Sequence, residues 1–168
     1  MSELSFEEYH LYSPYYVDSS DRTTGTFKYK GFFEKLNNLP PNIKDLFLGD
    51  FETAKFIKRV ITDNSLDEKR GEELARVVKD LLFADLYLGN VVNAIKDRLG
   101  IDEQKAKTIA GLIVIELFAP ILDDLKKMHT EKFAGATKEQ EVKSKPSPQP
   151  SIQPPTEDES IIDLRNIL

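Results

Sequence analysis

The sequence predicts a mainly α-helical protein, a compact bundle of five to six helices between Leu39 and Phe133. Three observations support this fold class. Residues that start and stop helices recur along the chain, apolar residues return every three or four positions between them, and a hydrophobic content of 40% suffices for one packed core. Composition divides the chain into an N-terminal strap, the bundle, a linker and a terminal peptide: 1–38, 39–133, 134–160 and 161–168.

Proline and glycine delimit the first two predicted helices. The first spans about 41–48, because Pro41 can occupy a first-turn position, where a helix needs no amide donor. Gly49 ends this helix. The second spans about 51–62, and Asp50 is its predicted N-cap because a carboxylate accepts hydrogen bonds from the first amides.

The next predicted helices also begin and end at recognisable residues. Ser65, followed three residues later by Glu68, forms a capping box for a long helix that ends near Ala84. A fourth helix covers 91–99, and Gly100 ends it because glycine adopts the left-handed conformation without strain.

The last part of the bundle is the most apolar. Asp102 caps a helix over about 103–118, after which Pro120 either kinks this helix or begins a last one that ends near Phe133. The longest apolar run, 109–122, is shorter than the roughly 20 residues that cross a bilayer. We therefore expect a buried core helix here and no membrane partner.

Two segments of the bundle resemble each other at an offset of 35 residues. Residues 66–70 match 101–105, and 82–84 match 117–119. One interpretation is a pair of helix-hairpin repeats that share a core, because a single hairpin cannot bury both of its faces. The other is that two unrelated helices use the same start signal and the same apolar spacing.

The N-terminal strap, residues 1–38, holds 9 of the 16 aromatic residues. We expect it to lie across the bundle, with a short helical turn over 5–11. Residues 26–30 alternate with period two, so a short hairpin with 15–17 is one interpretation of this region. Whether the aromatic residues form a strap or a binding surface stays open.

The C-terminal part changes character twice. Residues 134–160 are rich in Pro, Ser, Gln, Lys and Glu, which predicts a disordered linker because so few apolar groups cannot offset the chain entropy. The terminal peptide 161–168 is aliphatic and resembles a segment that docks as a helix in a groove or adds a strand to a sheet. The predicted partner-binding residues are Ile161, Ile162, Leu164, Ile167 and Leu168.

No catalytic or cofactor-binding motif occurs in the sequence. Phosphate-binding glycine loops, the nucleophile elbow, HExxH and the EF-hand are all missing, and cysteine is absent, so we expect no enzyme and no cofactor. Glu7 and His10 have the spacing of di-iron ligands but lack the second copy of that motif, so no metal site is expected. His129 follows two lysines near a helix end, where a partly cationic surface imidazole is favoured.

Glu116 lies inside the apolar run and offers an alternative function. A carboxylate there must reach solvent, find a partner or raise its pKa. A small-ligand-binding or enzymatic bundle built around a buried Glu116 is therefore the rival hypothesis. Lys55, Lys58 and Arg59 share one face of the second helix, and we interpret them as a solvated surface, with an anionic partner as the alternative.

Charge and the N-terminus narrow the class of partner. The net charge of -6 and pI near 5.1 argue against nucleic acid, since phosphate binding requires clustered lysine and arginine. The first 17 residues lack the basic and apolar parts of a secretory signal, so we expect a cytoplasmic protein. The oligomeric state is left open, and a homo-oligomer remains an alternative.

One family resemblance follows from these patterns. The order LPP, LDE and IDE helix starts, FAPI before the last helix, and a Pro-rich tail ending in IIDLRNIL is similar to small helical proteins of candidate-phyla-radiation bacteria. The resemblance covers about 39–133 and, more loosely, the tail. It implies a helical fold and carries over no site and no activity. The predicted function is a protein–protein interaction adaptor or assembly factor.

Overall fold

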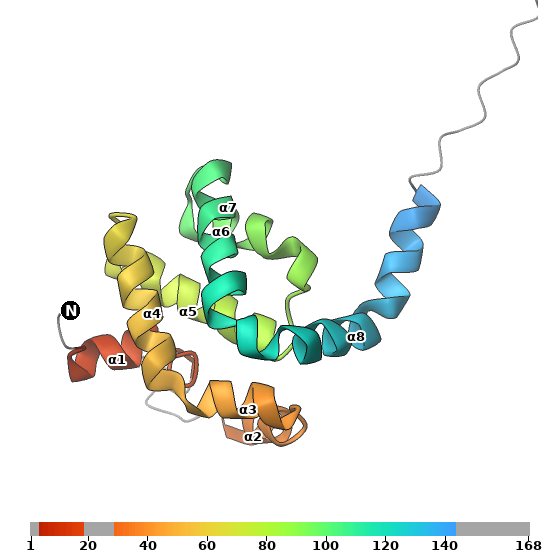
Figure 1. The fold of residues 1–168 in the computed structure, drawn as a ribbon, viewed down its shortest axis with the longest axis horizontal. Helices are drawn as coiled ribbons and strands as arrows, with labels where there is room; N and C mark the ends of the chain where they lie inside the picture. The colour runs from red at the N-terminus through yellow and green to blue at the C-terminus, as the bar shows by residue number, and fades with distance from the viewer. Residues whose placement is uncertain (1–3, 19–28, 144–168) are drawn as a thin grey trace, which may run out of the picture.

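The computed structural model describes residues 4–18 and 29–143, and its regular structure in these residues is entirely helical (Figure 1). The prediction of a mainly α fold is confirmed. The helices are α1 Phe6–Tyr12, α2 Tyr29–Asn37, α3 Pro41–Leu48, α4 Asp50–Asp63, α5 Glu68–Leu82, α6 Val91–Leu99, α7 Glu103–Leu112 and α8 Leu122–Lys143. Shorter turns are η1 Leu88–Asn90, the π-helical η2 Ile113–Leu117 and η3 Ala119–Ile121.

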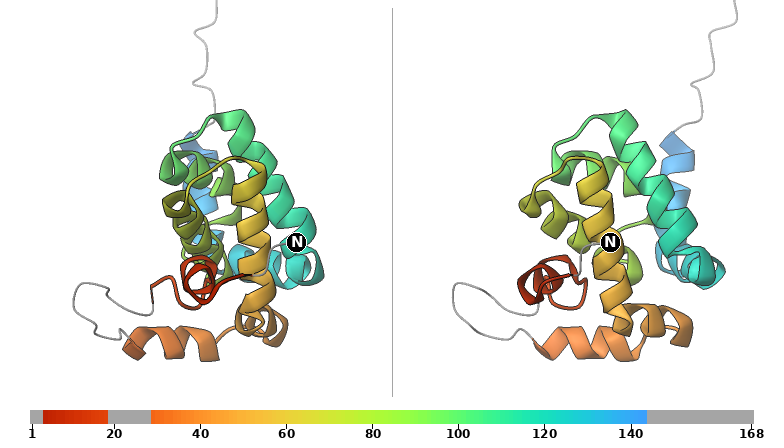
Figure 2. Two further views of the ribbon diagram at one scale, coloured as in Figure 1. Left: turned by 90° about the vertical axis from the view of Figure 1, so that its left-hand side faces the viewer. Right: turned by 60° about the vertical axis from the view of Figure 1, so that its left-hand side comes forward.

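The six helices α3 to α8 form the bundle, as expected for residues 39–133. α5 is its central element, because one side of this helix packs against α4 and α1 and the other against α6. Its apolar side chains Leu74, Val78, Leu81 and Leu82 are fully buried. They meet equally buried residues of neighbouring helices, and removing this apolar surface from water is the main stabilisation of the fold. α2 and α3 lie at one end of the molecule (Figure 2).

The two halves of the 35-residue pattern form two helix hairpins, α4–α5 and α6–α7. The turns match in geometry: Ser65 and Gly100 both adopt the left-handed conformation, with φ of 52° and 61°. In each turn the next amide donates back to a carbonyl five residues earlier, at 2.8 Å in the first hairpin and 3.2 Å in the second. This arrangement ends each helix while satisfying its last carbonyls.

The second helix of each hairpin begins at an aspartate. Asp67 and Asp102 accept hydrogen bonds from the amides three residues later, at 2.9 and 2.8 Å. The predicted cap at Asp102 is confirmed. The predicted capping box at Ser65 is wrong, because Ser65 belongs to the turn and Asp67 is the N-cap.

Pro120 starts a new helix. The proline has no amide hydrogen, so the preceding helix cannot continue through it, and the chain passes through the wider π-helical turn η2. The Phe118 amide donates to the Ile113 carbonyl at 2.9 Å. After η3 the chain enters α8, which runs to Lys143 and projects beyond the other helices (Figure 1). Residues 134–143, which the sequence assigns to the linker, continue this helix.

The strap is part of the core. We use this name from here for residues 4–18, which contain α1 and the turn after it. Tyr12 and Val17 are buried in the same apolar cluster as α4 and α5, and the strap crosses these two helices in Figures 1 and 2. The predicted hairpin is wrong where it can be compared, because Tyr29 begins α2 and 15–17 form a turn; residues 26–28 lie outside the described residues.

Candidate functional site

The predicted partner-binding residues Ile161, Ile162, Leu164, Ile167 and Leu168 lie outside the described residues. The last described residue is Lys143, at the end of α8. The candidate site that the structure does describe is on the bundle. None of the helices in the described ranges combines the length and apolar character needed to cross a bilayer.

Rings from α1, the turn after it and α4 form a connected surface, which we call the aromatic face. Successive ring centroids along it lie 4.3 Å (Phe6–His10), 4.6 Å (His10–Tyr16), 5.5 Å (Tyr16–Tyr9) and 5.7 Å (Tyr9–Phe51) apart. Most of these pairs meet edge to face, the favourable geometry for rings whose faces are negative and edges positive. The aromatic face consists of Phe6, Tyr9, His10, Tyr16 and Phe51.

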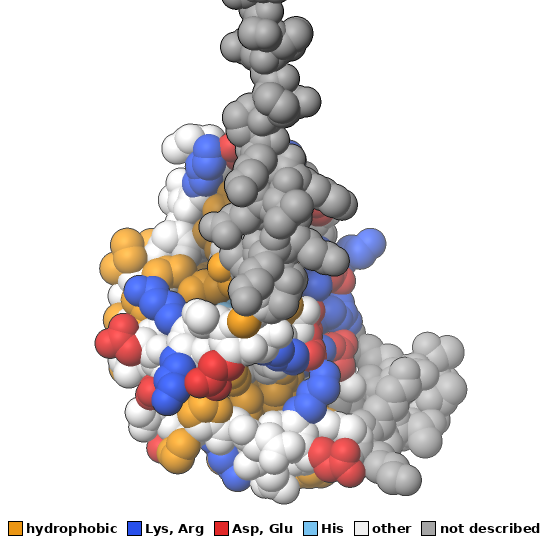
Figure 3. Space-filling model, turned by 90° about the vertical axis from the view of Figure 1, so that its right-hand side faces the viewer, with side chains coloured by type: hydrophobic (Ala, Val, Ile, Leu, Met, Phe, Trp, Pro, Cys, Tyr) orange, Lys and Arg blue, Asp and Glu red, His pale blue; other side chains and the backbone are white. Residues whose placement is uncertain are grey.

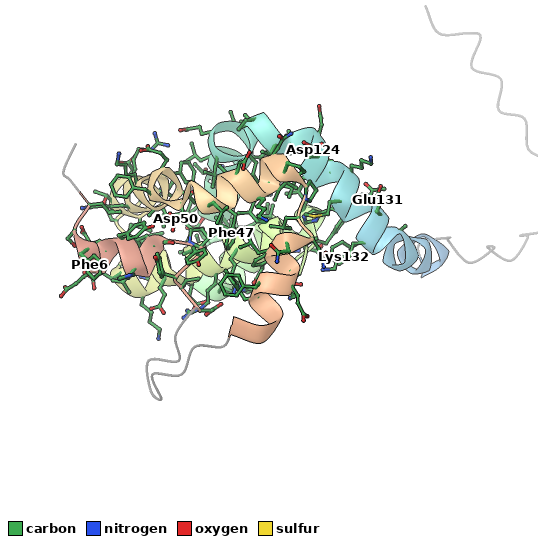
Figure 4. The ribbon with its side chains drawn as sticks, turned by 90° about the horizontal axis from the view of Figure 1, so that it is seen from below. Phe6, Phe47, Asp50, Asp124, Glu131 and Lys132 are labelled. Carbon is green, nitrogen blue, oxygen red and sulfur yellow. The ribbon has the colours of Figure 1, made fainter. Side chains whose placement is uncertain are left out.

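Two phenylalanines of the aromatic face are open to solvent. Phe6 is 75% exposed and Phe51 45% exposed. Figure 4 shows Phe6 at the outer end of α1. The ammonium group of Lys55 lies 4.5 Å from the Phe51 centroid, a cation–π contact that partly covers this ring.

Asp50 holds the strap to α4. Its carboxylate accepts hydrogen bonds from the Tyr9 hydroxyl at 2.7 and 2.8 Å and from the Ser13 hydroxyl at 2.6 Å. Asp50 is only 8% exposed, and it lies where α1 meets α4 (Figure 4). The prediction that Asp50 caps α4 is wrong: it is the first residue of the helix, Gly49 is the N-cap, and the carboxylate turns to the strap instead.

The Tyr9 hydroxyl remains a donor. Burial and then the hydrogen bond to Asp50 raise the pKa of the Tyr9 phenol above its ordinary value. The Ser13 hydroxyl also accepts from the amides of Tyr15 and Tyr16, at 3.2 and 3.3 Å. One carboxylate and one hydroxyl therefore fix the position of the whole turn after α1.

A glycine makes room for the strap on α5. A Cβ atom at Gly71 would lie 2.6 Å from the Tyr12 ring and 2.9 Å from the side chain of Ile61. The ring of Tyr12 thus fills a hollow that only glycine provides at this position. Thr53, one helical turn after Asp50, is buried, and its hydroxyl finds no hydrogen-bond partner among the described residues.

Charged residues of α4 bind neighbouring side chains. Lys55 pairs with Glu52 at 2.9 Å, and Lys58 pairs with Glu8 of the strap at 2.8 Å. The hydrogen bond to Lys58 lowers the pKa of the Glu8 carboxyl. These pairs agree with the interpretation of a solvated surface. Charges of both signs are also interspersed on the side of the molecule that faces the viewer in Figure 3, the right-hand side of Figure 1.

Glu116 does not form a buried site. Its side chain is exposed and pairs with Arg59 across the gap between η2 and α4. The rival hypothesis of a ligand-binding or enzymatic bundle therefore loses the buried carboxylate on which it depended.

His129 is a buried neutral residue, so the prediction of a partly cationic surface imidazole is wrong. Its Nδ1 accepts from the Leu88 amide at 3.1 Å, which leaves Nε2 protonated to donate to the Leu81 carbonyl at 2.8 Å. Burial lowers the pKa of His129, and the nearby charge of Lys132 adds to this effect. The imidazole joins α8 to the end of α5 and to η1.

Glu7 and His10 lie on α1, and within the described residues no group of three or more potential metal ligands comes together. The His10 ring instead packs against Phe6 and Tyr16. Glu7 and His10 are near neighbours because they share one helical turn.

Comparisons with protein-family models, with curated proteins and with solved structures find no match for this chain. Function is therefore inferred from the chain's own residues.

Sequence reasoning missed the residues that fix the strap. Gly71 carried a signal, because a glycine inside a helix of strong helix formers usually has a packing reason. Nothing in the sequence indicates that Asp50 contacts the strap, since an aspartate is common at the start of a helix. The partners of Asp50 lie about 40 residues away, as the separations of 37 and 41 residues in its hydrogen bonds show.

Proposed function

We propose that this chain is a protein–protein interaction adaptor or assembly factor with two binding elements. The bundle binds one partner through the aromatic face, and the tethered peptide 161–168 binds a second. The observation that supports the first element most is the exposure of Phe6 and Phe51 on a surface whose rings are packed against one another. Exposed aromatic side chains are typical of protein interaction sites.

The second element is supported by the sequence alone. Ile161, Leu164 and Leu168 have the spacing of a helix that docks in a groove, and an acidic, proline-rich segment joins them to the bundle. Linking two weak contacts raises the apparent affinity, because the second contact forms at a high effective concentration. Cytoplasmic residence, binding rather than catalysis, and the exclusion of nucleic-acid and membrane partners belong to the same proposal.

Crosslinking capture with four versions of the chain tests this function. They are the full chain, a truncation after Glu159, the double variant Phe6→Ser with Phe51→Ser, and the control Ile115→Ser, whose side chain is 73% exposed outside the aromatic face. We expect the truncation to lose one set of crosslinked proteins and the double variant to lose a different set. The control should keep both sets. Identical sets from all four chains would refute the adaptor function.

A further inference from the structure

The two helices that carry the aromatic face begin with the same pair of residues. Phe51 and Glu52 lie in the first turn of α4. Phe6 and Glu7 are the first two residues of α1. In α4 this pair holds a cation: the Lys55 ammonium lies 4.5 Å from the Phe51 centroid and 2.9 Å from a carboxylate oxygen of Glu52. A ring and a carboxylate therefore bind one lysine together in this chain.

The pair on α1 has no such cation. His10 stands where the spacing of α4 has Lys55, four residues after the phenylalanine and three after the glutamate. The His10 ring packs almost perpendicular to that of Phe6, at 81°. Phe6 is nevertheless 75% exposed, and the exposed Glu7 side chain forms no ion pair with any of the described residues. The pair on α1 is therefore open to a cation that these residues do not supply.

We propose that Phe6 and Glu7 bind a lysine or arginine side chain of the partner protein that docks on the aromatic face. The cation lies over the Phe6 ring and pairs with the Glu7 carboxylate, as Lys55 does with the pair on α4. This inference rests on the proposed function, in which the aromatic face binds a partner, and it deepens that function by stating the charge that the partner presents there. It does not depend on the terminal peptide 161–168.

The charges of α1 favour a cationic partner. This helix carries two carboxylates, Glu7 and Glu8, and no lysine or arginine. Glu8 already pairs with Lys58 of α4 at 2.8 Å, so Glu7 is the carboxylate of α1 that remains for a partner. Complementary charge across an interface selects the partner and speeds association. A lysine or arginine also suits exposed rings, because its methylene stem covers apolar surface while its charged end stays in water.

A cationic peptide tests the site. The probe is a short fluorescent helical peptide of leucine and lysine, and the comparison peptide has glutamine in place of each lysine. Both are titrated with the full chain at about 0.15 M salt, where attraction between distant charges is screened. We expect the glutamine peptide to bind at least about fivefold more weakly than the lysine peptide, because it offers no cation to the ring and the carboxylate.

Three variants locate the contact. Phe6→Leu removes the ring but keeps an apolar side chain, and Glu7→Gln removes only the charge. Both side chains are exposed, so neither variant disturbs the core, and each should weaken binding of the lysine peptide by about two- to fivefold. The control Glu131→Gln makes the same change of charge at an exposed carboxylate of α8, far from Phe6 in Figure 4, and should bind as the parent chain does.

The variant His10→Lys tests the correspondence with α4. It gives α1 the cation that Lys55 gives α4, at the helical spacing that brings side chains together. The site is then filled within the chain, and we expect the lysine peptide to bind at least about fivefold more weakly than to the parent chain. His10→Gln removes the same ring without adding a charge and should retain more affinity than His10→Lys.

Several outcomes would overturn the proposal. They are absence of binding, equal binding of the two peptides, and equal affinity of the parent, Phe6→Leu and Glu7→Gln chains for the lysine peptide. Self-association of the parent chain that Glu7→Gln abolishes, measured by light scattering, would place the cation on a second copy of this chain and not on a different protein.

Failure of this site and failure of the adaptor function give different results. Identical captured sets, together with peptide binding that depends on Phe6 and Glu7, would refute the adaptor and keep the cation site. A set that the Phe6→Ser with Phe51→Ser variant loses but Glu7→Gln and His10→Lys keep would refute the cation site and keep the adaptor.

Discussion

Asp50 and His129 are buried polar side chains that each connect segments distant in the sequence. Asp50 joins the strap to α4, and His129 joins α8 to the end of α5. A buried polar group is costly unless it is hydrogen-bonded, so each residue stabilises only the arrangement that supplies its partners. Both residues therefore favour one arrangement of the helices. Apolar contacts alone would tolerate more than one arrangement.

Replacing Asp50 should destabilise the domain. Asp50→Ala removes an acceptor that serves Tyr9 and Ser13, and we expect the free energy of unfolding to fall by about 2–3 kcal/mol because these bonds involve a charged group. Urea unfolding measures the change. The control Glu52→Ala alters an exposed carboxylate on the same helix and should stay within about 0.5 kcal/mol of the parent chain. Equal effects of the two substitutions would show that Asp50 does not hold the strap.

His129 should make the domain sensitive to mild acid. Burial lowers the pKa of His129 in the folded protein, whereas in the unfolded chain it returns to about 6.5. The unfolded state then binds a proton more readily, so the stability contributed by the neutral imidazole is complete above about pH 6.5 and is lost as the pH falls toward the folded pKa. We expect a lower urea midpoint at pH 5.5 than at pH 7.5.

The variant His129→Gln is the control for this pH dependence. Glutamine does not titrate, so the difference between the two midpoints should shrink even though the variant is less stable overall. Carboxyl groups such as Glu8, whose pKa is lowered, titrate at more acidic pH and contribute little in this window. An unchanged difference in the glutamine variant would assign the pH dependence to another group.

At the scale of the element, helix ends that depend on a residue within one turn of the chain agree with the sequence predictions. Pro41, Gly100 and Asp102 act within one turn of the chain, and the helices that they start or end agree with the predictions. The turn residue Ser65 was misassigned because Asp67 lies close by and competes for the same role.

Elements that depend on tertiary contacts were predicted less well. The alternating pattern of 26–30 favours a hairpin, but Tyr29 and Lys30 begin α2, and Leu36 of this helix is buried in the core. The aromatic content of the strap was clear from the sequence. Its docking through Tyr12, Asp50 and Gly71 was not, since that contact joins residues far apart in the chain.

Alanine substitutions at two glycines distinguish the contribution of the Tyr12 contact to stability from that of helix propensity. Gly71→Ala gains about 1 kcal/mol of helix propensity but places a methyl group against the Tyr12 ring, and we expect a net loss of about 1–2 kcal/mol. Gly111→Ala, in α7, meets no atom within 4 Å and should instead stabilise the protein by up to about 1 kcal/mol. Thermal unfolding of both variants measures these changes. Stabilisation by both substitutions would show that Tyr12 does not depend on the hollow.

At the scale of the whole molecule, the described helices share one connected apolar core, and α8 projects beyond the other helices (Figure 1). The aromatic face and the peptide 161–168 can then act as separate binding elements. If the peptide belonged to the core, its aliphatic side chains would be unavailable to a partner.

The melting temperature of the full chain and of a chain truncated after Glu159 tests this separation most directly. We expect the two values to agree within about 1 °C, because the proposed function places the terminal peptide outside the core, and removing such a segment leaves the free energy of unfolding unchanged. A decrease of about 5 °C or more in the truncated chain would correspond to the loss of roughly 1 kcal/mol or more of stabilisation. That result would place the terminal peptide inside the bundle and contradict the adaptor function.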